Sequence, residues 1–255
     1  MEILQTPFSC QRGNLTIRGI AFGDTQPGRH AVILSHGFLG DQGTVRDYAL
    51  ILAGDGFLAV TFDFSGGGPH STSDGKTEDM TVLTEKEDLM AVIREVQTRY
   101  QPASLSLMGG SQGGFVSALT ARALGAGTIR SLMLFFPAFC IPDDARRGQL
   151  MFFRFDPDHV PELLGSKPMK LGGEYARAVM NMDPYAEISG YAGPVLLIHG
   201  TADDIVDIRY ARKAKEYYND CEYHEIEGGG HGFSGEHEEE ARRLLRAFMK
   251  RTVTD

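Results

Sequence analysis

Short apolar runs alternate with amphipathic stretches along most of this 255-residue chain, and the alternation predicts its secondary structure. Apolar runs bounded by turn residues are typical of strands buried on both faces of a sheet. We expect such strands at residues 31–35, 58–62, 132–136 and 195–199, and further strands at 105–108 and 221–226. Ahead of them, residues 2–10 and 15–22 predict an antiparallel hairpin that turns at Gly13-Asn14.

Between the expected strands, apolar residues recur at three-to-four spacing, which is the period of an amphipathic helix. Helices are expected at residues 45–53, from residue 84 to beyond 96, and at 115–124, 209–218 and 238–250. Thr84 and Glu87 have the spacing of a capping box, so the second helix is expected to begin there. Strands and helices in this alternation predict an α/β protein whose mostly parallel sheet is covered by helices on both faces.

One segment, at about residues 137–185, interrupts this alternation. The stretch 131–182 around it holds five of the ten Met and six of the fifteen Phe. An irregular segment this apolar favours a cap over a pocket, the alternative being an ordinary helical insertion with its own small core. Because no repeat or low-complexity linker divides the chain, we expect one domain over residues 1–255, with a cap insertion at about 137–185.

The charge balance limits the kinds of molecule that the protein is expected to bind. The chain has 25 Lys and Arg against 34 Asp and Glu, a formal net charge of −9, which argues against binding to nucleic acid or to an anionic membrane. Its three cysteines are widely separated, so neither a disulfide framework nor a cysteine zinc site is expected. The first residues lack the pattern of a signal peptide, and the longest apolar run is half a membrane span. We expect a cytoplasmic globular protein.

A glycine-rich turn contains the first candidate for chemistry. Gly109-Gly110-Ser111-Gln112-Gly113 matches the pattern G-x-S-x-G and lies between an expected strand and an expected helix. A serine on a sharp strand-to-helix turn needs neighbours without side chains, because its backbone is strained and other segments pass close by. The motif alone is weak, so Ser111 becomes a candidate nucleophile only if a base and an acid accompany it.

Both partners follow in the chain, each just past the end of an expected strand. Asp203 follows the strand at 195–199, and His231 lies in a glycine-rich loop after the strand at 221–226. Open α/β sheets place their sites at these carboxyl ends, so we expect the three side chains to meet. In the order Ser, Asp, His, the histidine would deprotonate Ser111 and the aspartate would orient the histidine.

Alternatives remain for the acid and for the base. Asp203 could instead be the N-cap of a helix, which would leave Asp204 as the acid. Three other histidines compete for the role of His231, namely His199, His224 and His237. His231 is favoured because it lies on a loop flanked by glycines, whereas the other two that follow Asp203 lie in a strand and at the start of an acidic helix.

Acyl transfer also needs backbone amides that stabilise the oxyanion of the tetrahedral intermediate. One amide is that of Gln112, the residue after the nucleophile. The other is expected in the loop Ser35-His36-Gly37-Phe38, where Phe38 is our second donor.

Glycine is over-represented, with 31 of 255 residues, or about 12% against an average of roughly 7%. Ten of these glycines lie in the three loops just described, where the backbone must approach a substrate or adopt strained dihedrals. They are Gly37, Gly40, Gly109, Gly110, Gly113, Gly114, Gly228, Gly229, Gly230 and Gly232.

Two further patterns do not lead to other chemistry. Gly230-x-Gly232-x-x-Gly235 fits the dinucleotide fingerprint, but only 20 residues follow it, too few for the rest of that unit. The side chains of the acidic run at residues 236–240 point in different directions around an expected helix, and we expect them to be solvated. We therefore expect no cofactor and no metal.

Taken with these motifs, the sequence resembles the α/β-hydrolase serine esterases and, among them, the bacterial cinnamoyl (feruloyl) esterases. The general motifs are His36-Gly37-Phe38, Ser111-Gln112-Gly113-Gly114, residues 199–206 and Gly230-His231. More specific are the stretches 137–138, 141–148, 155–161 and 171–175 in the cap segment. The resemblance covers essentially the whole chain, and it implies an α/β-hydrolase fold whose insertion shapes an aromatic acyl pocket.

The same resemblance implies residues that contact the substrate. Asp144 and Tyr175 are the candidates for holding the ring hydroxyl of a hydroxycinnamate, with Gln149 as a third. The chain departs from the family at Gly110, where related proteins commonly have a bulky residue, often His, before the serine. This departure changes the surroundings of the nucleophile and implies a shift in acyl preference.

These residues predict a serine carboxylic ester hydrolase that releases hydroxycinnamates through an acyl-enzyme. Short-chain acyl esterases, monoacylglycerol lipases, thioesterases and some peptidases use the same groups, and a non-catalytic binding protein on this fold is a different class. The expected partner is a small-molecule ester, without nucleic acid or membrane. An exposed apolar rim on the cap could support a homodimer.

Overall fold

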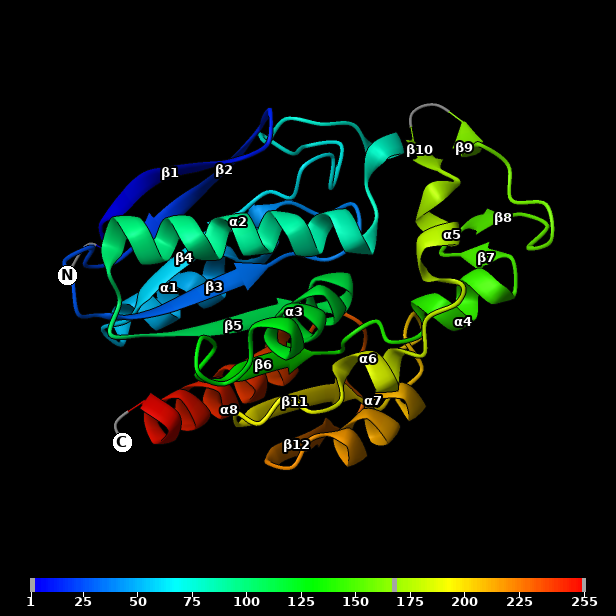
Figure 1. Cartoon of the computed structure of the whole chain (residues 1–255). Helices are drawn as coiled ribbons and strands as arrows, with labels where there is room; N and C mark the ends of the chain where they lie inside the picture. Colours follow the sequence, from blue (N-terminus) through cyan, green and yellow to red (C-terminus); the bar gives the residue numbers. More distant parts are fainter. Residues whose placement is uncertain (1–2, 167–168, 254–255) are drawn as a thin grey trace.

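The computed structural model describes residues 3–166 and 169–253, and its centre is an eight-stranded sheet (Figure 1). The strands of this sheet are β1 (Gln5–Arg12), β2 (Leu15–Phe22), β3 (His30–Ser35), β4 (Leu58–Phe62), β5 (Ser104–Gly110), β6 (Leu132–Phe135), β11 (Val195–Gly200) and β12 (Cys221–Ile226). Their spatial order is β1-β2-β4-β3-β5-β6-β11-β12. β2 pairs antiparallel with both β1 and β4, and all the other neighbours are parallel. The predicted α/β fold with a mostly parallel sheet is therefore confirmed.

Helices cover both faces of the sheet, because the side chains of each strand alternate between two apolar layers. The helices of the main body are α1 (Arg46–Gly54), α2 (Val82–Tyr100), α3 (Ser111–Leu124), α7 (Arg209–Ala214) and α8 (Gly235–Val253). In β3, Ile33 packs in the layer that includes α2 and α3, whereas Val32 and Leu34 pack in the layer of α1 and α8. Figure 1 shows α8 and α2 on opposite sides of the sheet.

The cap segment, residues 137–185, lies between β6 and β11 and projects beyond the carboxyl ends of the parallel strands (Figure 1). It and the residues just after it contain α4 (Ile141–Arg146), β7 (Gln149–Leu150), β8 (Phe153–Arg154), β9 (Leu163–Ser166), β10 (Met169–Gly172), α5 (Glu174–Val179) and α6 (Pro184–Ile188). β7 with β8 and β9 with β10 form two small antiparallel hairpins, which the sequence did not predict. The division into one domain with a cap stays a prediction.

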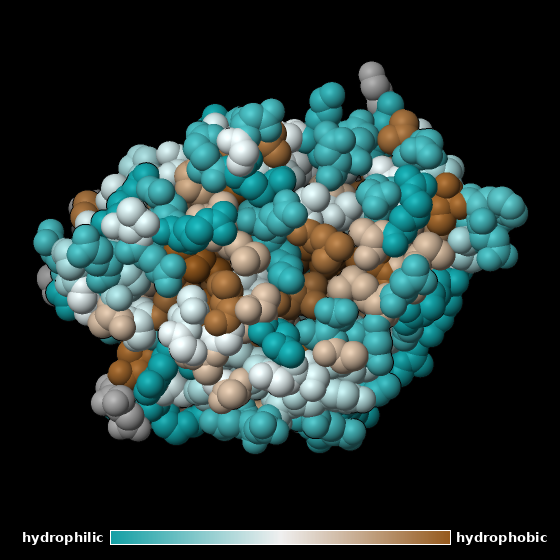
Figure 2. Space-filling view, in the orientation of Figure 1, coloured by the Kyte–Doolittle hydropathy of each residue, from teal (hydrophilic) through white to brown (hydrophobic). Residues whose placement is uncertain are grey.

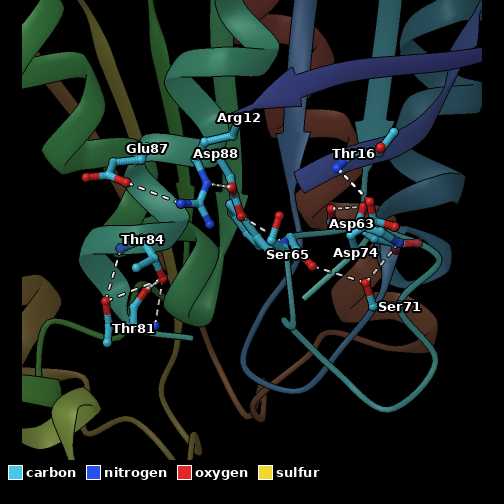
Figure 3. Close-up of polar contacts among 12 residues, drawn as sticks. Arg12, Thr16, Asp63, Ser65, Ser71, Asp74, Thr81, Thr84, Glu87 and Asp88 are labelled. Carbon is cyan, nitrogen blue, oxygen red and sulfur yellow. Dashed lines mark hydrogen bonds and ion pairs between the residues drawn. The ribbon is translucent and has the colours of Figure 1, made fainter. Parts of the chain in front are cut away.

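Helix α2 begins two residues earlier than expected, so the predicted capping box at Thr84 and Glu87 is wrong. Thr81 is the N-cap, and its side chain accepts a hydrogen bond from the Thr84 N–H at 3.0 Å. In return the Thr81 N–H donates to the Thr84 hydroxyl at 2.8 Å. A threonine at the third helical position thus takes the part that Glu or Gln usually plays in a capping box. Figure 3 shows both bonds.

Carboxylates hold the loop of residues 63–76, which follows β4 (Figure 3). Asp63 accepts from the Thr72 hydroxyl at 2.6 Å and from the Gln42 N–H at 2.7 Å, so it joins this loop to the one that follows β3. Asp88 of α2 accepts from the Ser65 N–H at 2.7 Å and pairs with Arg12 of β1. These bonds hold in place the loops at the carboxyl ends of the parallel strands, where the site lies.

The face shown in Figure 2 is mainly hydrophilic, with hydrophobic residues gathered across its middle. Three of the large apolar side chains exposed in the described structure belong to the cap segment, namely Met151, Phe152 and Leu163. Within the described ranges, no helix is long and apolar enough to cross a membrane.

Candidate active site

Ser111 lies on a turn that the sequence can form only with glycine around it. It is the first residue of α3, immediately after β5, and its φ of 53° is in the left-handed region that few residues other than glycine adopt. A Cβ at Gly113 would lie 2.3 Å from the His36 carbonyl oxygen, and one at Gly109 would lie 2.3 Å from the Gly113 carbonyl oxygen. The glycines of the G-x-S-x-G motif thus let β5, α3 and the β3 loop approach closely behind the serine.

The structure brings Ser111, His231 and Asp203 into one hydrogen-bonded chain. His231 Nε2 lies 3.0 Å from Ser111 Oγ, and His231 Nδ1 lies 2.9 Å from Asp203 Oδ2. With the proton on Nδ1 shared with the carboxylate, Nε2 is free to accept the serine proton. The histidine side chain is 20% exposed, whereas the aspartate is fully buried. This arrangement can activate a serine as a nucleophile.

Asp203, rather than Asp204, faces the histidine. The Asp203 carboxylate also accepts hydrogen bonds from the N–H groups of Ile205, at 2.9 Å, and Val206, at 2.8 Å. Burial raises the pKa of Asp203, but hydrogen bonds from His199, His231 and Val206 outweigh burial and hold it well below its ordinary value. A carboxylate that stays ionised can stabilise the imidazolium that forms during acyl transfer. Asp204 is exposed.

His199 contacts Asp203, and the sequence did not indicate this role. It is fully buried, and its Nε2 lies 3.1 Å from Asp203 Oδ2 and 2.9 Å from the Val206 carbonyl oxygen. Its position at the end of β11, four residues before the acid, was the available signal. His224 lies elsewhere and pairs with Glu222 at 2.7 Å.

The loop after β3 passes close to Ser111. A Cβ at Gly37 would lie 3.2 Å from Ser111 Cβ and 3.7 Å from its Oγ, so only a residue without a side chain fits comfortably there. Phe38 follows Gly37, and Gln112 lies in the first turn of α3, where backbone N–H groups have no acceptor within the helix. The structure therefore places both predicted oxyanion donors on segments that border Ser111.

His36 fixes the shape of this loop. Its Nε2 accepts a hydrogen bond from the Phe64 N–H at 3.1 Å, and its Nδ1 donates to the Gly37 carbonyl at 2.8 Å. Burial lowers the pKa of His36 below its ordinary value, which favours the neutral ring that this pair of bonds requires. The histidine thereby ties the loop after β3 to the segment that follows β4.

A cavity of about 360 Å³, here called the cap pocket, opens at Ser111 beneath the cap segment. Its lining brings together the three candidates for substrate contact, which are Asp144, Gln149 and Tyr175. Burial raises the pKa of the Asp144 carboxyl above its ordinary value. The Gln149 amide oxygen already accepts from Arg154 at 2.7 Å. A polar group of a bound molecule could meet these side chains.

Buried polar side chains connect the cap segment to Gln112, one of the two predicted oxyanion donors. The Tyr175 hydroxyl of α5 donates to the Gln112 side-chain oxygen, and the Gln112 amide donates to Glu85 of α2 at 2.8 Å. Burial raises the pKa of Glu85 well above its ordinary value, which favours the neutral carboxylic acid. Sequence reasoning did not find Glu85, because a glutamate on a helix is usually solvated.

No cluster of three or more His, Cys, Asp or Glu side chains that could hold a metal ion occurs within residues 3–166 and 169–253.

A family model described as serine aminopeptidase S33, of the hydrolases, matches residues 26–176, more than half of the chain. The chain belongs to this family. The match includes Ser111 and most of the cap segment. No curated protein matches this S33 family member at the level of sequence.

Solved structures with the same fold cover nearly the whole of this S33 family member. Est1E from Butyrivibrio proteoclasticus, solved with ferulic acid bound, has a TM-score of 0.87 at 24% identity, over 97% of this chain and 100% of that one. The Pyrococcus furiosus esterase Pf2001 has a TM-score of 0.72 at 18% identity, over 98% of this chain and 93% of that one. The chain therefore has the α/β-hydrolase fold that its resemblance implied.

Proposed function

We propose that the protein is a serine carboxylic ester hydrolase that releases hydroxycinnamate-type acids from their esters. The observation that carries this proposal is the chain of hydrogen bonds from Asp203 through His231 to Ser111, which ends at the cap pocket. The similarity of the fold to Est1E, whose structure contains ferulic acid, supports the choice of acyl group.

In the proposed mechanism, His231 takes the proton of Ser111 as the hydroxyl oxygen attacks the ester carbonyl. The Phe38 and Gln112 N–H groups stabilise the oxyanion, and Asp203 stabilises the imidazolium. His231 then donates its proton to the leaving alcohol, which leaves the acyl group on Ser111. Water attacks the acyl-enzyme by the reverse route and releases the acid.

The cap pocket recognises the acyl group of the substrate. The Asp144 carboxylate can accept a hydrogen bond from a phenolic hydroxyl. Tyr175 also lines this pocket, and because its hydroxyl donates its proton to Gln112, the oxygen can serve a ligand only as an acceptor. Two acceptors in one pocket suit the phenolic hydroxyl of a ferulate-type ring, which is a donor.

A second candidate is an aminopeptidase, because that is how the matching family model is described. The carboxylates of Asp144 and Asp204, which both line the cap pocket, could hold the free amino group of such a substrate. The leaving group would then be an amine in place of an alcohol.

The decisive experiment combines covalent labelling with a substrate panel. A fluorophosphonate should label the wild-type protein but not Ser111→Ala, and the variant should lose at least about 10⁴-fold in kcat. Labelling of Ser111→Ala, or its undiminished turnover, would refute the nucleophile.

The panel consists of methyl ferulate, p-nitrophenyl butyrate, a monoacylglycerol, an acyl-thioester and an amino-acid naphthylamide. Methyl ferulate should give the highest kcat/KM of the five after correction for leaving-group reactivity. Preference for butyrate without ferulate turnover would exclude the hydroxycinnamate substrate, and preference for the naphthylamide would favour the aminopeptidase.

A further inference from the structure

A second cavity meets Ser111 on a different side from the cap pocket. It has a volume of about 310 Å³ and lies against η1 (Gln42–Val45) and α1, so it is here called the α1 pocket. The side chains that give it its apolar character are Val45, Met108, Phe135, Phe136, Met151 and Ile205. Among the described residues that line it, none is Asp, Glu, Lys or Arg, whereas the cap pocket is lined by Asp144 and Asp204.

The position of His231 tells the two pockets apart. His231 lines the α1 pocket and does not line the cap pocket, although the two pockets share Phe38, Ser111, Met151 and Ile205. In ester cleavage the histidine must donate a proton to the leaving oxygen, so the leaving alcohol has to lie beside this ring. The alcohol half of an ester is therefore directed into the α1 pocket, and the acyl half into the cap pocket.

The glycine before the nucleophile belongs to this second pocket. Gly110 lines the α1 pocket, and a Cβ at Gly110 would lie 3.3 Å from Cε2 of Phe136. The Phe136 ring in turn packs against His231, with ring centroids 4.8 Å apart. A larger residue at position 110 would push into this aromatic side of the pocket. The departure at Gly110 thus bears on the alcohol side of the site, where the sequence had implied an effect on the acyl group.

We propose that the α1 pocket is the alcohol subsite and that it takes a chain-like apolar alcohol in preference to a polar one such as a sugar. This inference rests on the proposed esterase function. Apolar lining next to the proton donor binds methylene groups. A polar alcohol that entered would lose water and would find few polar side chains in return, chiefly the hydroxyls of Thr44 and Tyr48.

The test measures kcat/KM for ethyl, butyl and 2-methoxyethyl esters of whichever acid the substrate panel identifies as best. Butyl and 2-methoxyethyl groups have equal length, and the latter is the slightly better leaving group, so intrinsic reactivity opposes the prediction. Each buried methylene should raise kcat/KM up to about fourfold. The butyl ester should therefore exceed the ethyl ester by about tenfold and should also exceed the 2-methoxyethyl ester.

A variant then localises the effect. Thr44 is exposed at the α1 pocket, so Thr44→Phe should fill the entrance and reduce the butyl-to-ethyl ratio to near one. Arg46→Phe is the matched control, because Arg46 is exposed two residues away and lines neither pocket; it should keep the wild-type ratio.

A measurement on the wild-type protein is independent of any variant. The acyl-enzyme should transfer its acyl group to added 1-butanol more than to 2-methoxyethanol, with His231 taking the alcohol proton and returning it to Ser111. Equal transfer, a flat or inverted ester series, or a Thr44→Phe effect on acyl length instead would overturn the inference. If no ester in the panel is hydrolysed, the proposed function fails; if esters are hydrolysed without this alcohol preference, only the subsite assignment fails.

Discussion

A carboxyl group inside the molecule links the cap segment to the nucleophile turn. Glu85 is 1% exposed and accepts from Gln112, whose side chain also binds Tyr175. An acid whose pKa is raised by folding is protonated in the folded chain and ionised in the unfolded chain over the pH range between the two pKa values. Over that range the folded state binds more protons, so its stability falls as pH rises.

Glu85→Gln should remove this dependence while it keeps an acceptor for Gln112. Above about pH 4.3, the ordinary pKa of Glu, the variant should gain free energy of unfolding relative to wild type by about 1.4 kcal/mol per pH unit, up to the folded pKa. Urea denaturation from pH 4 to pH 8 measures the difference. Glu87→Gln, on an exposed residue of the same helix, is the control and should show no such trend. A constant difference between Glu85→Gln and wild type would contradict the assignment.

The substrate contact of Asp144 is a second question at the scale of single residues. If its carboxylate accepts from a ring hydroxyl, Asp144→Asn should lower kcat/KM for methyl ferulate by roughly tenfold or more. Methyl cinnamate, which lacks that hydroxyl, should change by about twofold at most if the lost bond is the cause.

Asp143→Asn is the matched control for this measurement. Asp143 pairs with Arg146 and Tyr210 and does not line the cap pocket, so its loss should leave the ferulate-to-cinnamate ratio as in wild type. If Asp144→Asn lowered kcat/KM equally for both substrates, Asp144 would have only a structural role.

At the scale of elements, the periodicity of apolar residues predicted the sheet and the main helices. It did not predict the elements of the cap segment, which depend on tertiary contacts. The parallel strands lie within a residue or two of their expected bounds. Those covered on both faces were recognised because such a strand is apolar at nearly every position. The two hairpins of the cap segment are two to four residues per strand, too short for an alternation to be recognised. Helix α3 begins at Ser111, four residues before the expected start, because glycine has a low helix propensity and Gly113 and Gly114 hide the first turn.

The end of α2 offers a direct test of local backbone strain. Gln101 is the C-cap and adopts a left-handed conformation with φ of 46°, which favours glycine. Gln101→Gly should raise the free energy of unfolding by about 0.5–1 kcal/mol.

The same substitution one turn earlier should act in the opposite direction. Gln97 is exposed within the helix, so Gln97→Gly should cost about 1 kcal/mol. Urea denaturation of both variants measures the two effects. A loss of stability in Gln101→Gly would show that its αL conformation is not strained.

At the scale of the whole molecule, acid should unfold the protein partly through Asp203, the proposed catalytic carboxylate. The pKa of Asp203 is lower in the folded chain than its ordinary value, so the folded state binds fewer protons than the unfolded state at acidic pH. Its contribution to stability is present above about pH 3.9 and is lost as pH falls toward the folded pKa.

Asp203→Asn should therefore weaken the fall in unfolding free energy between pH 5 and pH 3, as measured by urea denaturation. Asp204→Asn, on the exposed neighbour, should keep the steeper wild-type dependence. Identical slopes for the two variants would contradict the hydrogen-bonded, ionised state of Asp203.

The sequence by itself determined the α/β alternation, the family resemblance and the residues of the candidate site. It could do so because buried strands and glycine-lined turns impose strong local constraints on residue type. Only the tertiary structure decided that Asp203 and not Asp204 faces His231, that His199 and Glu85 support the site, and that Gly110 borders a second pocket. Each of these depends on segments that are far apart in the chain and meet at the carboxyl ends of the parallel strands. No local sequence pattern indicates which side chains face each other there.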